Sequence, residues 1–319
     1  MLQRVVRWLD EATRVLIIFH EFPDGDGIAS SLALARALKS LGKEADCVCK
    51  DPPPPVFSFL PGFNTIKSDF ILAEYDLLCV VDCGDSKRTG FPERIKAFAQ
   101  KKKKVINIDH HLKNDLHKTA NLNLVDPKAA ASAELVFRIV EALDAAIDKE
   151  MATLLLTGLF TDTGGFQHSN TSCEVYRLAS RLLSRGARLR QLAQNIALNK
   201  PLAMLQIWGV ALSRIWQTPH GMVVSLVTQD DIRRLGATVE DIAGAVNIIN
   251  SIPDTKTTIL LLEMPDGKIR ASLRTEDDKI DVAALAAVFG GGGHRKAAGF
   301  TVEGSLRCDS SGRWQIRLA

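Results

Sequence analysis

Three mostly apolar runs constrain the fold of this chain more than any other feature. They lie at 15–19, 76–81 and 105–108, and each has about the length of one buried strand. Between them, at 28–41 and 92–100, the apolar residues instead recur with helical spacing. Strands that read as continuous apolar runs and alternate with helices are typical of a parallel sheet covered on both faces. The sequence therefore predicts an α/β fold with such a sheet in its N-terminal half.

The rest of the chain predicts a second, smaller α/β domain. Helical patterns dominate 132–198, and one long helix with proline at its start is expected at 201–216. Strand and helix patterns then return at 222–227, 257–262, 268–274 and 282–289. At 319 residues the chain can bury two separate cores. We expect a first domain at 1–198, a connector helix at 199–217 and a second domain at 218–319.

Composition excludes several classes of protein. A net charge of +3 is too small to bind long nucleic acid by charge alone. The six cysteines form no CxxC pair, so we expect reduced thiols in a cytoplasmic protein rather than a zinc module. We also expect no membrane segment, because no apolar stretch approaches spanning length. We expect no signal peptide, because the N-terminus lacks a signal-peptide core and cleavage site.

Acidic residues and histidines follow each of the three apolar runs. The predicted set is His20, Asp24 and Asp26 after the first run, Asp82 after the second, and Asp109, His110 and His111 after the third. Asp162, which follows an apolar helical stretch, is expected to join them. Because the carboxyl ends of parallel strands meet at one edge of a sheet, we expect these side chains to lie close together.

Carboxylates and imidazoles together favour a divalent cation. Mn²⁺ suits this mixture best, with Mg²⁺, Fe²⁺, Co²⁺ or Zn²⁺ as alternatives. Two cations about 3.5–4 Å apart can activate water and neutralise the oxygens of a phosphoester. Single residues also have structural explanations: Asp24 and Asp26 suit a turn or a helix cap, and His20 suits a core. The agreement of several strand ends favours a metal site over these explanations.

Several sequence blocks resemble the DHH phosphoesterase superfamily. They are HEFPDGDGIAS at 20–30, VDCGD at 81–85, DHH at 109–111 and GLFTDTGG at 158–165. Two later blocks resemble its DHHA1 substrate domain, ASLR at 271–274 and GGGGHRKAAG at 290–299. Within the superfamily the chain is most similar to the bifunctional oligoribonuclease and pAp phosphatase group, the nanoRNases.

The resemblance implies a role for each matched residue. One Mn²⁺ would be held by His20, Asp24 and Asp82, and the other by Asp26, Asp82, His110 and Asp162. Asp82 would then bridge the two ions. Catalytic roles would fall to Asp82, Asp109, His110 and His111, with His111 facing the phosphate or supporting the ligands, and Asp109 orienting a neighbour. The substrate would be gripped by Arg274, Gly291, Gly292, Gly293 and His294.

The second domain also suggests an anion site from its residues alone. Strand alternation puts Arg270, Ser272 and Arg274 on one face, and an arginine can bind a terminal phosphate with two hydrogen bonds. The glycines before His294 would let an anion approach the backbone, especially if a helix begins after them. A hinge or a helix stop after Phe289 explains the glycines as well.

We therefore expect a Mn²⁺-dependent phosphoesterase. It would release 5′-mononucleotides from oligonucleotides of a few residues and dephosphorylate 3′-phosphoadenosine 5′-phosphate (pAp). Length preference would follow from the distance between the two domains. We expect the protein to bind short oligonucleotides, dinucleotides or pAp, and to bind neither a long duplex nor a membrane. The sequence is also compatible with a homodimer. The open alternatives are a cyclic or linear dinucleotide phosphodiesterase and a catalytically silent nucleotide-binding regulator.

Overall fold

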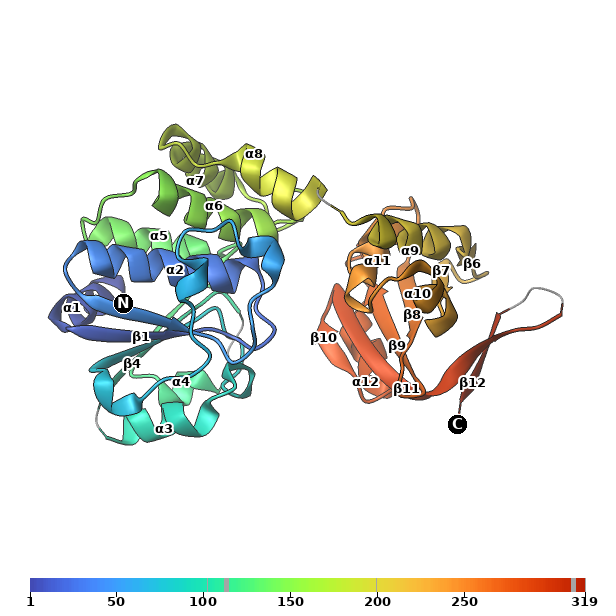
Figure 1. Cartoon of the computed structure of the whole chain (residues 1–319), viewed down its shortest axis with the longest axis horizontal. Coiled ribbons are helices and arrows are strands. Elements are labelled where there is room, and N and C mark those ends of the chain that lie inside the picture. The colour runs from blue at the N-terminus through green and yellow to red at the C-terminus, as the bar shows by residue number, and fades with distance from the viewer. Residues whose placement is uncertain (102, 112–114, 199, 311–313, 319) are drawn as a thin grey trace. The chain divides into compact units, whose positions relative to one another are not determined.

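The chain forms two compact units, Met1–Asn199 and Lys200–Ala319. A computed structural model describes residues 1–101, 103–111, 115–198, 200–310 and 314–318. Figure 1 shows the elements of both units. In the described part of the chain, no helix has both the length and the apolar character needed to cross a bilayer.

The first unit is built on a five-stranded parallel sheet. Its strands are β1 (Arg14–Ile18), β2 (Glu44–Val48), β3 (Leu77–Val81), β4 (Lys104–Asp109) and β5 (Leu122–Val125). The order is β2-β1-β3-β4-β5, and every neighbouring pair is parallel. The predicted parallel sheet is confirmed, and the three apolar runs lie side by side within it. The short edge strand β5 was not predicted, because its Leu-Asn-Leu-Val sequence has only two apolar residues in a row.

Helices cover both faces of this sheet (Figure 1). On one side lie α1 (Leu2–Glu11), α2 (Gly25–Ser40), α5 (Ser132–Ala142), α6 (Lys149–Asp162) and α7 (Cys173–Ser184), and on the other α3 (Pro92–Gln100) and α4 (Leu116–Thr119). Because side chains alternate along a strand, Val15 and Ile17 are buried under the first group. Leu16 and Ile18 are buried under the second. Helix α8 (Leu189–Leu192) and a π-helical turn (Ala193–Leu198) end the unit.

The second unit is built on a mixed sheet. Its strands are β6 (Trp216–Gln217), β7 (Met222–Val227), β8 (Thr257–Glu263), β9 (Lys268–Arg274), β10 (Gly292–His294), β11 (Ala297–Cys308) and β12 (Trp314–Leu318). Its helices are α9 (Leu202–Ser213), α10 (Gln229–Leu235), α11 (Ala245–Asn250) and α12 (Val282–Val288). The order is β10-β11-β9-β8-β7-β6, with β12 paired to β11. Only β7 and β8 pair in parallel among these strands. The predicted α/β class is thus confirmed for this unit as well.

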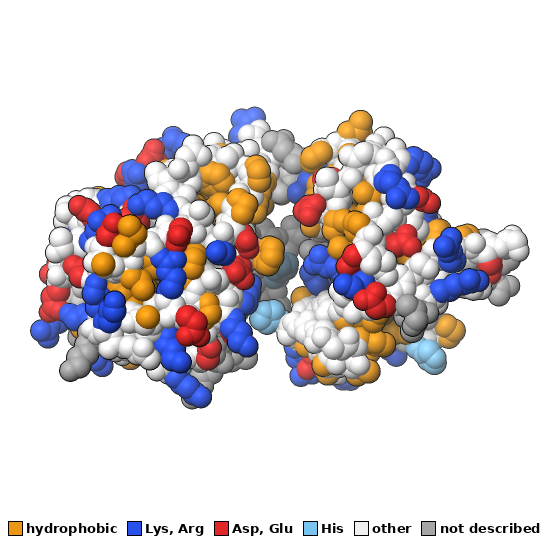
Figure 2. Space-filling view, turned by 60° about the horizontal axis from the view of Figure 1, so that its bottom comes forward, with side chains coloured by type: hydrophobic (Ala, Val, Ile, Leu, Met, Phe, Trp, Pro, Cys, Tyr) orange, Lys and Arg blue, Asp and Glu red, His pale blue; other side chains and the backbone are white. Residues whose placement is uncertain are grey.

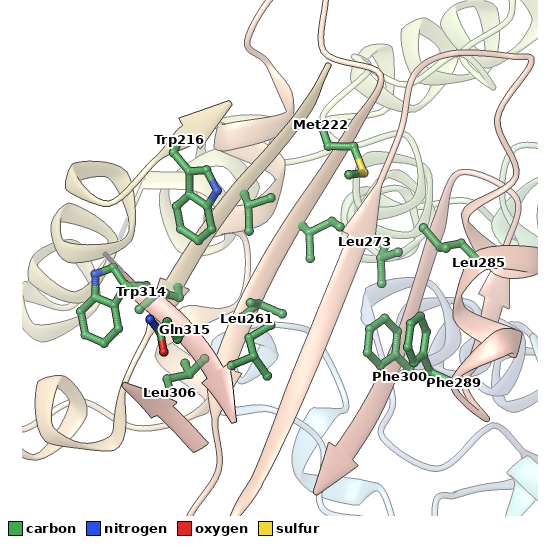
Figure 3. A pocket seen from close by; sticks show the side chains of 14 residues that line it. Trp216, Met222, Leu261, Leu273, Leu285, Phe289, Phe300, Leu306, Trp314 and Gln315 are labelled. Atoms are coloured by element: carbon green, nitrogen blue, oxygen red, sulfur yellow. The ribbon is translucent and has the colours of Figure 1, made fainter. Parts of the chain in front are cut away.

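One face of the mixed sheet is only partly covered by helix. On the covered face Val223 and Leu260 pack with Ile207 of α9 and Ile249 of α11. In the described part of the unit, α12 is the only helix on the opposite face, and the rest of that face lines an apolar pocket of about 480 Å³. Figure 3 shows Trp216 and Trp314 at one end of this pocket and Phe289 and Phe300 at the other. The rings of the two phenylalanines stack with centroids 4.4 Å apart.

One expectation for this unit is wrong. The helix expected at 201–216 ends at Ser213, and Trp216 already lies in β6, paired with β7. Since Ile207 and Ala211 of α9 are fully buried against the second unit's own sheet, α9 is part of that unit's core. Asn199, the expected first residue of the connector, lies outside the described residues. No helix begins after the glycine run, the arrangement that would have favoured an anion site most, because Gly292 and Gly293 belong to β10, which pairs with β11.

The six cysteines are free, as their spacing predicted. Cys47, Cys49, Cys79 and Cys83 are buried, whereas Cys173 and Cys308 are exposed. Burial raises the pKa of the Cys47, Cys49 and Cys83 thiols to about 12, which keeps them protonated and unreactive.

An ion pair between the buried carboxylate of Asp231 and the partly buried guanidinium of Arg214 stabilises the second unit. Asp231, 4% exposed, accepts hydrogen bonds from Arg214 at 2.5 and 2.9 Å and caps α10 together with Thr228. Burial alone would raise the pKa of Asp231, but the hydrogen bonds from Arg214 and Thr228 lower it. The pair therefore stabilises the unit above the unfolded pKa of about 4, and this contribution is lost as the pH falls through the lower folded value.

Asp231→Asn should lower the free energy of unfolding at pH 7 by about 3 kcal/mol, because it leaves the Arg214 charge without its partner. The difference from wild type should shrink below pH about 4. Urea unfolding followed by fluorescence measures this, since three of the four tryptophans, Trp208, Trp216 and Trp314, lie in the second unit. The exposed neighbour Asp230→Asn is the control and should change little. Equal losses in both variants would contradict the assignment.

Candidate metal centre

The carboxyl ends of β1, β3 and β4 bring the predicted residues together. These three strands are neighbours in the sheet, so the residues that follow them share one edge. His20 lies two residues beyond β1, Asp82 directly follows β3, and Asp109 is the last residue of β4. Two residues from the start of α2, Asp24 and Asp26, and one from the end of α6, Asp162, join them.

The first group consists of His20, Asp24 and Asp82. The His20 Nε2 atom lies 3.5 Å from Asp24 Oδ1 and 3.8 Å from Asp82 Oδ2. Asp24 is also the N-cap of α2 and accepts hydrogen bonds from the amides of Asp26 and Gly27. The capping role considered for Asp26 therefore belongs to Asp24. The cap fixes the Asp24 carboxylate in place, so the structural role and a ligand role are compatible.

The second group consists of Asp26, His110 and Asp162. The His110 Nε2 atom lies 3.2 Å from Asp162 Oδ2. Each of the three side chains offers a ligand atom within 4.8 Å of the others. Asp26 is fully buried, whereas the side chains of His110 and Asp162 are 16% and 19% exposed. The group thus has a closed side and an open side.

Asp82 belongs to the first group and also reaches the second, with one oxygen toward the histidine of each. Its Oδ2 faces His20, and its Oδ1 is 3.5 Å from His110 Nε2. The side chain is 2% exposed, and the backbone has a φ of 54°, a left-handed conformation that aspartate adopts at a cost. Strain of this kind persists where the surrounding structure enforces it. Here it aims one carboxylate at two separate sets of donors.

Both histidines present the same nitrogen to the carboxylates. His20 Nδ1 is 2.7 Å from the Glu21 carbonyl oxygen, and His110 Nδ1 is 3.3 Å from that of Ala129. With Nδ1 facing a carbonyl oxygen, it is the Nε2 atom that points into the cluster. Metal-binding histidines are oriented by this same outer hydrogen bond.

The clustered negative charge shifts several pKa values. Burial, together with the charges of Asp82 and Asp162, raises the pKa of Asp26 well above its usual value. Burial and Asp82 raise the pKa of Asp162 to about 6, although the hydrogen bond from His110 opposes this. Burial disfavours the imidazolium of His110, but hydrogen bonds to Asp162 and Asp82 raise its pKa to about 12. The raised pKa values mean that the cluster retains protons when no cation is present to balance its negative charge.

The donor set fits divalent cations. The side chains offer carboxylate oxygens and imidazole nitrogens in three overlapping groups that could hold a metal ion: Asp82 with His110 and His111, His20 with Asp24 and Asp82, and Asp26 with His110 and Asp162. Gly27 leaves the space open, because a Cβ there would lie 3.2 Å from His20 Nε2 and 3.3 Å from Asp82 Oδ2. A compact cation would also relieve the repulsion among the buried carboxylates.

Asp109 and His111 form a hydrogen-bonded pair beside these groups. Asp109 is fully buried, and its Oδ1 accepts hydrogen bonds from the His111 backbone amide and from His111 Nδ1 at 2.7 Å. The hydrogen bond to Asp109 is the largest of the interactions that raise the pKa of His111. His111 Nδ1 also lies 3.9 Å from Asp82 Oδ1. Asp109 therefore orients the imidazole ring next to the cluster.

Four hydrogen-bond donors in this cluster, from three residues, were not predicted from the sequence. Ser30 Oγ donates to Asp26 Oδ1 at 2.7 Å, and Ser132 Oγ donates to Asp82 Oδ1 at 2.9 Å. The backbone amides of Ser132 and Ala133 donate to the two oxygens of Asp26. Ser132 begins α5, where serine commonly serves as a helix cap, so its sequence position gave no signal of a role in the cluster.

The second unit aligns its predicted residues across three strands. His294 of β10 pairs with Ala297 of β11, which pairs with Arg274 of β9. Directly paired residues point to the same face, so Arg274 and His294 share one face roughly 10 Å apart, two strand spacings. Arg274 Nε donates to Asn247 Oδ1 at 3.1 Å, and burial lowers the pKa of its guanidinium.

The glycine run has a packing role in this row. A Cβ on Gly291 would lie 2.2 Å from the Gly299 carbonyl oxygen, and one on Gly293 would lie 2.5 Å from that of Ala297. These two glycines let β10 approach β11. Gly292 has nothing within 4 Å of its Cβ position and faces open space. None of the predicted substrate residues lines the apolar pocket of this unit.

The surface carries no extended region of one charge on the face shown in Figure 2. Basic and acidic side chains are interspersed there on both units. This agrees with the small net charge of +3, and the face shown has no basic stripe for a long nucleic acid.

Known proteins are similar to this chain in sequence. A model of the DHH family, N-terminal domain, matches residues 14–159, and a model of the DHHA1 domain matches residues 221–310. The chain is 34% identical to the bifunctional oligoribonuclease and PAP phosphatase NrnA of Thermus thermophilus, over 91% of this chain and 84% of that protein. It is 28% identical to the protein of the same name from Mycoplasma genitalium, over 90% of this chain and 87% of that protein.

A solved structure agrees with this relationship. The crystal structure of an exopolyphosphatase-related protein from Bacteroides fragilis superposes with a TM-score of 0.87 at 28% identity, covering 94% of this chain and 90% of that one. The resemblance seen in the sequence blocks is confirmed. The chain belongs to the DHH family, with an N-terminal DHH domain followed by a DHHA1 domain.

Proposed function

We propose that this protein is a metal-dependent phosphoesterase that hydrolyses short oligonucleotides to 5′-mononucleotides and dephosphorylates pAp. The observation that carries the proposal is the orientation of Asp82, whose two oxygens face two separate His and Asp groups. A carboxylate between two such groups suits a pair of cations acting on one phosphate. The names of the relatives from Thermus thermophilus and Mycoplasma genitalium support the choice of substrates.

The proposed ligands divide as the groups do. His20, Asp24 and Asp82 would hold one cation. The second would be held by Asp26, Asp82, His110 and Asp162. Bound cations would supply activation of water and neutralisation of charge on the phosphate. Mn²⁺ is the proposed native ion, with Mg²⁺ or Co²⁺ as substitutes, because the site mixes imidazole nitrogen with carboxylate oxygen.

His111 is proposed to position the phosphate. Its ring is held by Asp109 at 2.7 Å and lies beside Asp82. The hydrogen bond to a buried carboxylate favours the charged imidazolium, which can donate to a phosphate oxygen. Preorganised donors of this kind stabilise charge that develops in the transition state.

The second unit is proposed as the substrate-binding domain, and the first as the catalytic domain. Arg274 and His294 lie in one row of the sheet and could bind phosphate or sugar oxygens of the substrate. The open glycine at 292 would let the backbone contact an anion as well. The buried free thiols support a reducing compartment, and we propose the cytoplasm.

A substrate panel tests the proposal directly. The full chain would be assayed with pAp, pApA, a longer oligonucleotide, cyclic di-AMP and pyrophosphate, in Mn²⁺, Mg²⁺, Co²⁺ or chelator. We expect pApA and pAp to be hydrolysed, the longer oligonucleotide to react slowly, and chelator to abolish turnover. Selective hydrolysis of cyclic di-AMP would support a cyclic dinucleotide phosphodiesterase instead. Tight nucleotide binding without turnover in any metal would support a regulator.

Asp82→Asn should reduce kcat for pApA by about 10³-fold or more, because a neutral amide cannot replace a charged carboxylate that is proposed to bind both cations. Initial rates at saturating Mn²⁺ measure the loss. Asp10→Asn, at an exposed position on α1, is the matched control and should keep wild-type rates. Mn²⁺-dependent turnover that survives Asp82→Asn unchanged would refute the proposed centre.

Arg274→Ala should raise KM for pApA by about 10–100-fold, since hydrogen bonds from a charged group to phosphate are lost. Arg270→Ala is the control. Arg270 is exposed on the same face of the same strand, but it pairs with Thr301 and so lies outside the row that contains Arg274 and His294. Steady-state kinetics separate KM from kcat. If both variants behave alike, Arg274 has no specific role in substrate binding.

A further inference from the structure

The N-terminus of α5 is capped by a residue from another helix. The N-cap residue Ala131 has no side chain that could accept a capping hydrogen bond. The Asp26 carboxylate of α2 takes that place: Oδ2 accepts from the Ser132 amide at 2.5 Å, and Oδ1 accepts from the Ala133 amide at 3.1 Å. The positive end of the α5 dipole therefore stabilises the most deeply buried carboxylate of the cluster.

Ser132 also contacts the second buried carboxylate. Its hydroxyl, which could have capped α5, instead donates to Asp82 Oδ1 at 2.9 Å. Ser132 is fully buried. One residue thus holds Asp26 through its backbone and Asp82 through its side chain.

The surroundings of Ser132 leave it little freedom. The Ala130 amide donates to Glu134 Oε1 at 2.6 Å, which closes the turn that leads into α5. The carbonyl of Ala129 in the same turn lies 3.3 Å from His110 Nδ1. On the far side, a Cβ at Gly158 would lie 2.3 Å from Asp26 Oδ1 and 2.7 Å from Ala133 Cβ. The turn, α5 and α6 therefore fit closely around the two carboxylates.

We propose that Ser132 is a positioning residue that fixes the angle at which Asp82 presents its two oxygens. The inference rests on the proposed two-cation function. The Ser132 hydroxyl occupies one lone pair of Asp82 Oδ1, the oxygen that faces His110, so the other lone pair is directed toward the Asp26, His110 and Asp162 group. Oδ2, which faces His20, has no such constraint from Ser132. Losing the hydroxyl should weaken cation binding at the His110 side more than at the His20 side.

The test is Mn²⁺ binding to the metal-free full chain by calorimetry, with electron paramagnetic resonance to detect coupling between paired ions. Ser132→Ala should weaken the binding of one Mn²⁺ by about 10–100-fold, the usual effect of losing an outer hydrogen-bond partner. The resonance signal of coupled ions should fall in parallel. Ser132→Thr, which keeps the hydroxyl, should restore both.

Ser31→Ala is the matched control. Ser31 is a fully buried serine of α2 whose hydroxyl has no hydrogen-bond partner among the residues that the structure describes. It should bind Mn²⁺ as wild type does. If Ser132→Ala fails to fold, Ser132→Cys keeps the volume but donates only weakly, and it should show the same loss.

Wild-type binding of both ions by folded Ser132→Ala would overturn the inference, and so would equal losses in Ser132→Ala and Ser132→Thr. Failure of wild type itself to bind two Mn²⁺ would overturn the proposed function instead. The two failures are therefore distinguishable in one set of titrations.

Discussion

Mutual repulsion among buried carboxylates at one edge of the parallel sheet organises the first unit. Asp26 and Asp82 are almost completely buried, and Asp162 lies close enough to raise the pKa of Asp26 further. Such a cluster is costly unless positive charge and hydrogen bonds surround it. The structure supplies two imidazoles, two serine hydroxyls and the first amides of α5. These donors satisfy the carboxylates on their buried side and leave the opposite side for ligands, which is the arrangement that our proposed function requires.

Much of this edge could be predicted, because the carboxyl ends of parallel strands lie at the same edge of a sheet. The apolar runs identified β1, β3 and β4, and parallel pairing put their carboxyl ends together, so His20, Asp82 and Asp109 had to lie near one another. Ser132 could not be found in this way, because its partner Asp82 is 50 residues distant and a serine at a helix start usually caps that helix. The strained backbone of Asp82 was also beyond prediction, since no turn signal marks it.

The second unit was harder to predict. Its strands at 222–227 and 268–274 have the expected bounds, because alternating or continuous apolar patterns mark them clearly. The glycine run gave no pattern at all, and β10 became visible only through its pairing with β11. The apolar spacing of α9 continues through Ile215 and Trp216, so the sequence alone does not show that the helix ends at Ser213 and that Trp216 pairs with β7. Tertiary packing, which the spacing does not encode, decides both features.

Anomalous X-ray diffraction from crystals soaked in Mn²⁺ would test the central claim most directly. The account predicts two anomalous peaks about 3.5–4 Å apart, one within reach of His20 and the other within reach of His110, with an Asp82 oxygen next to each. A single peak, or peaks remote from Asp82, would contradict it.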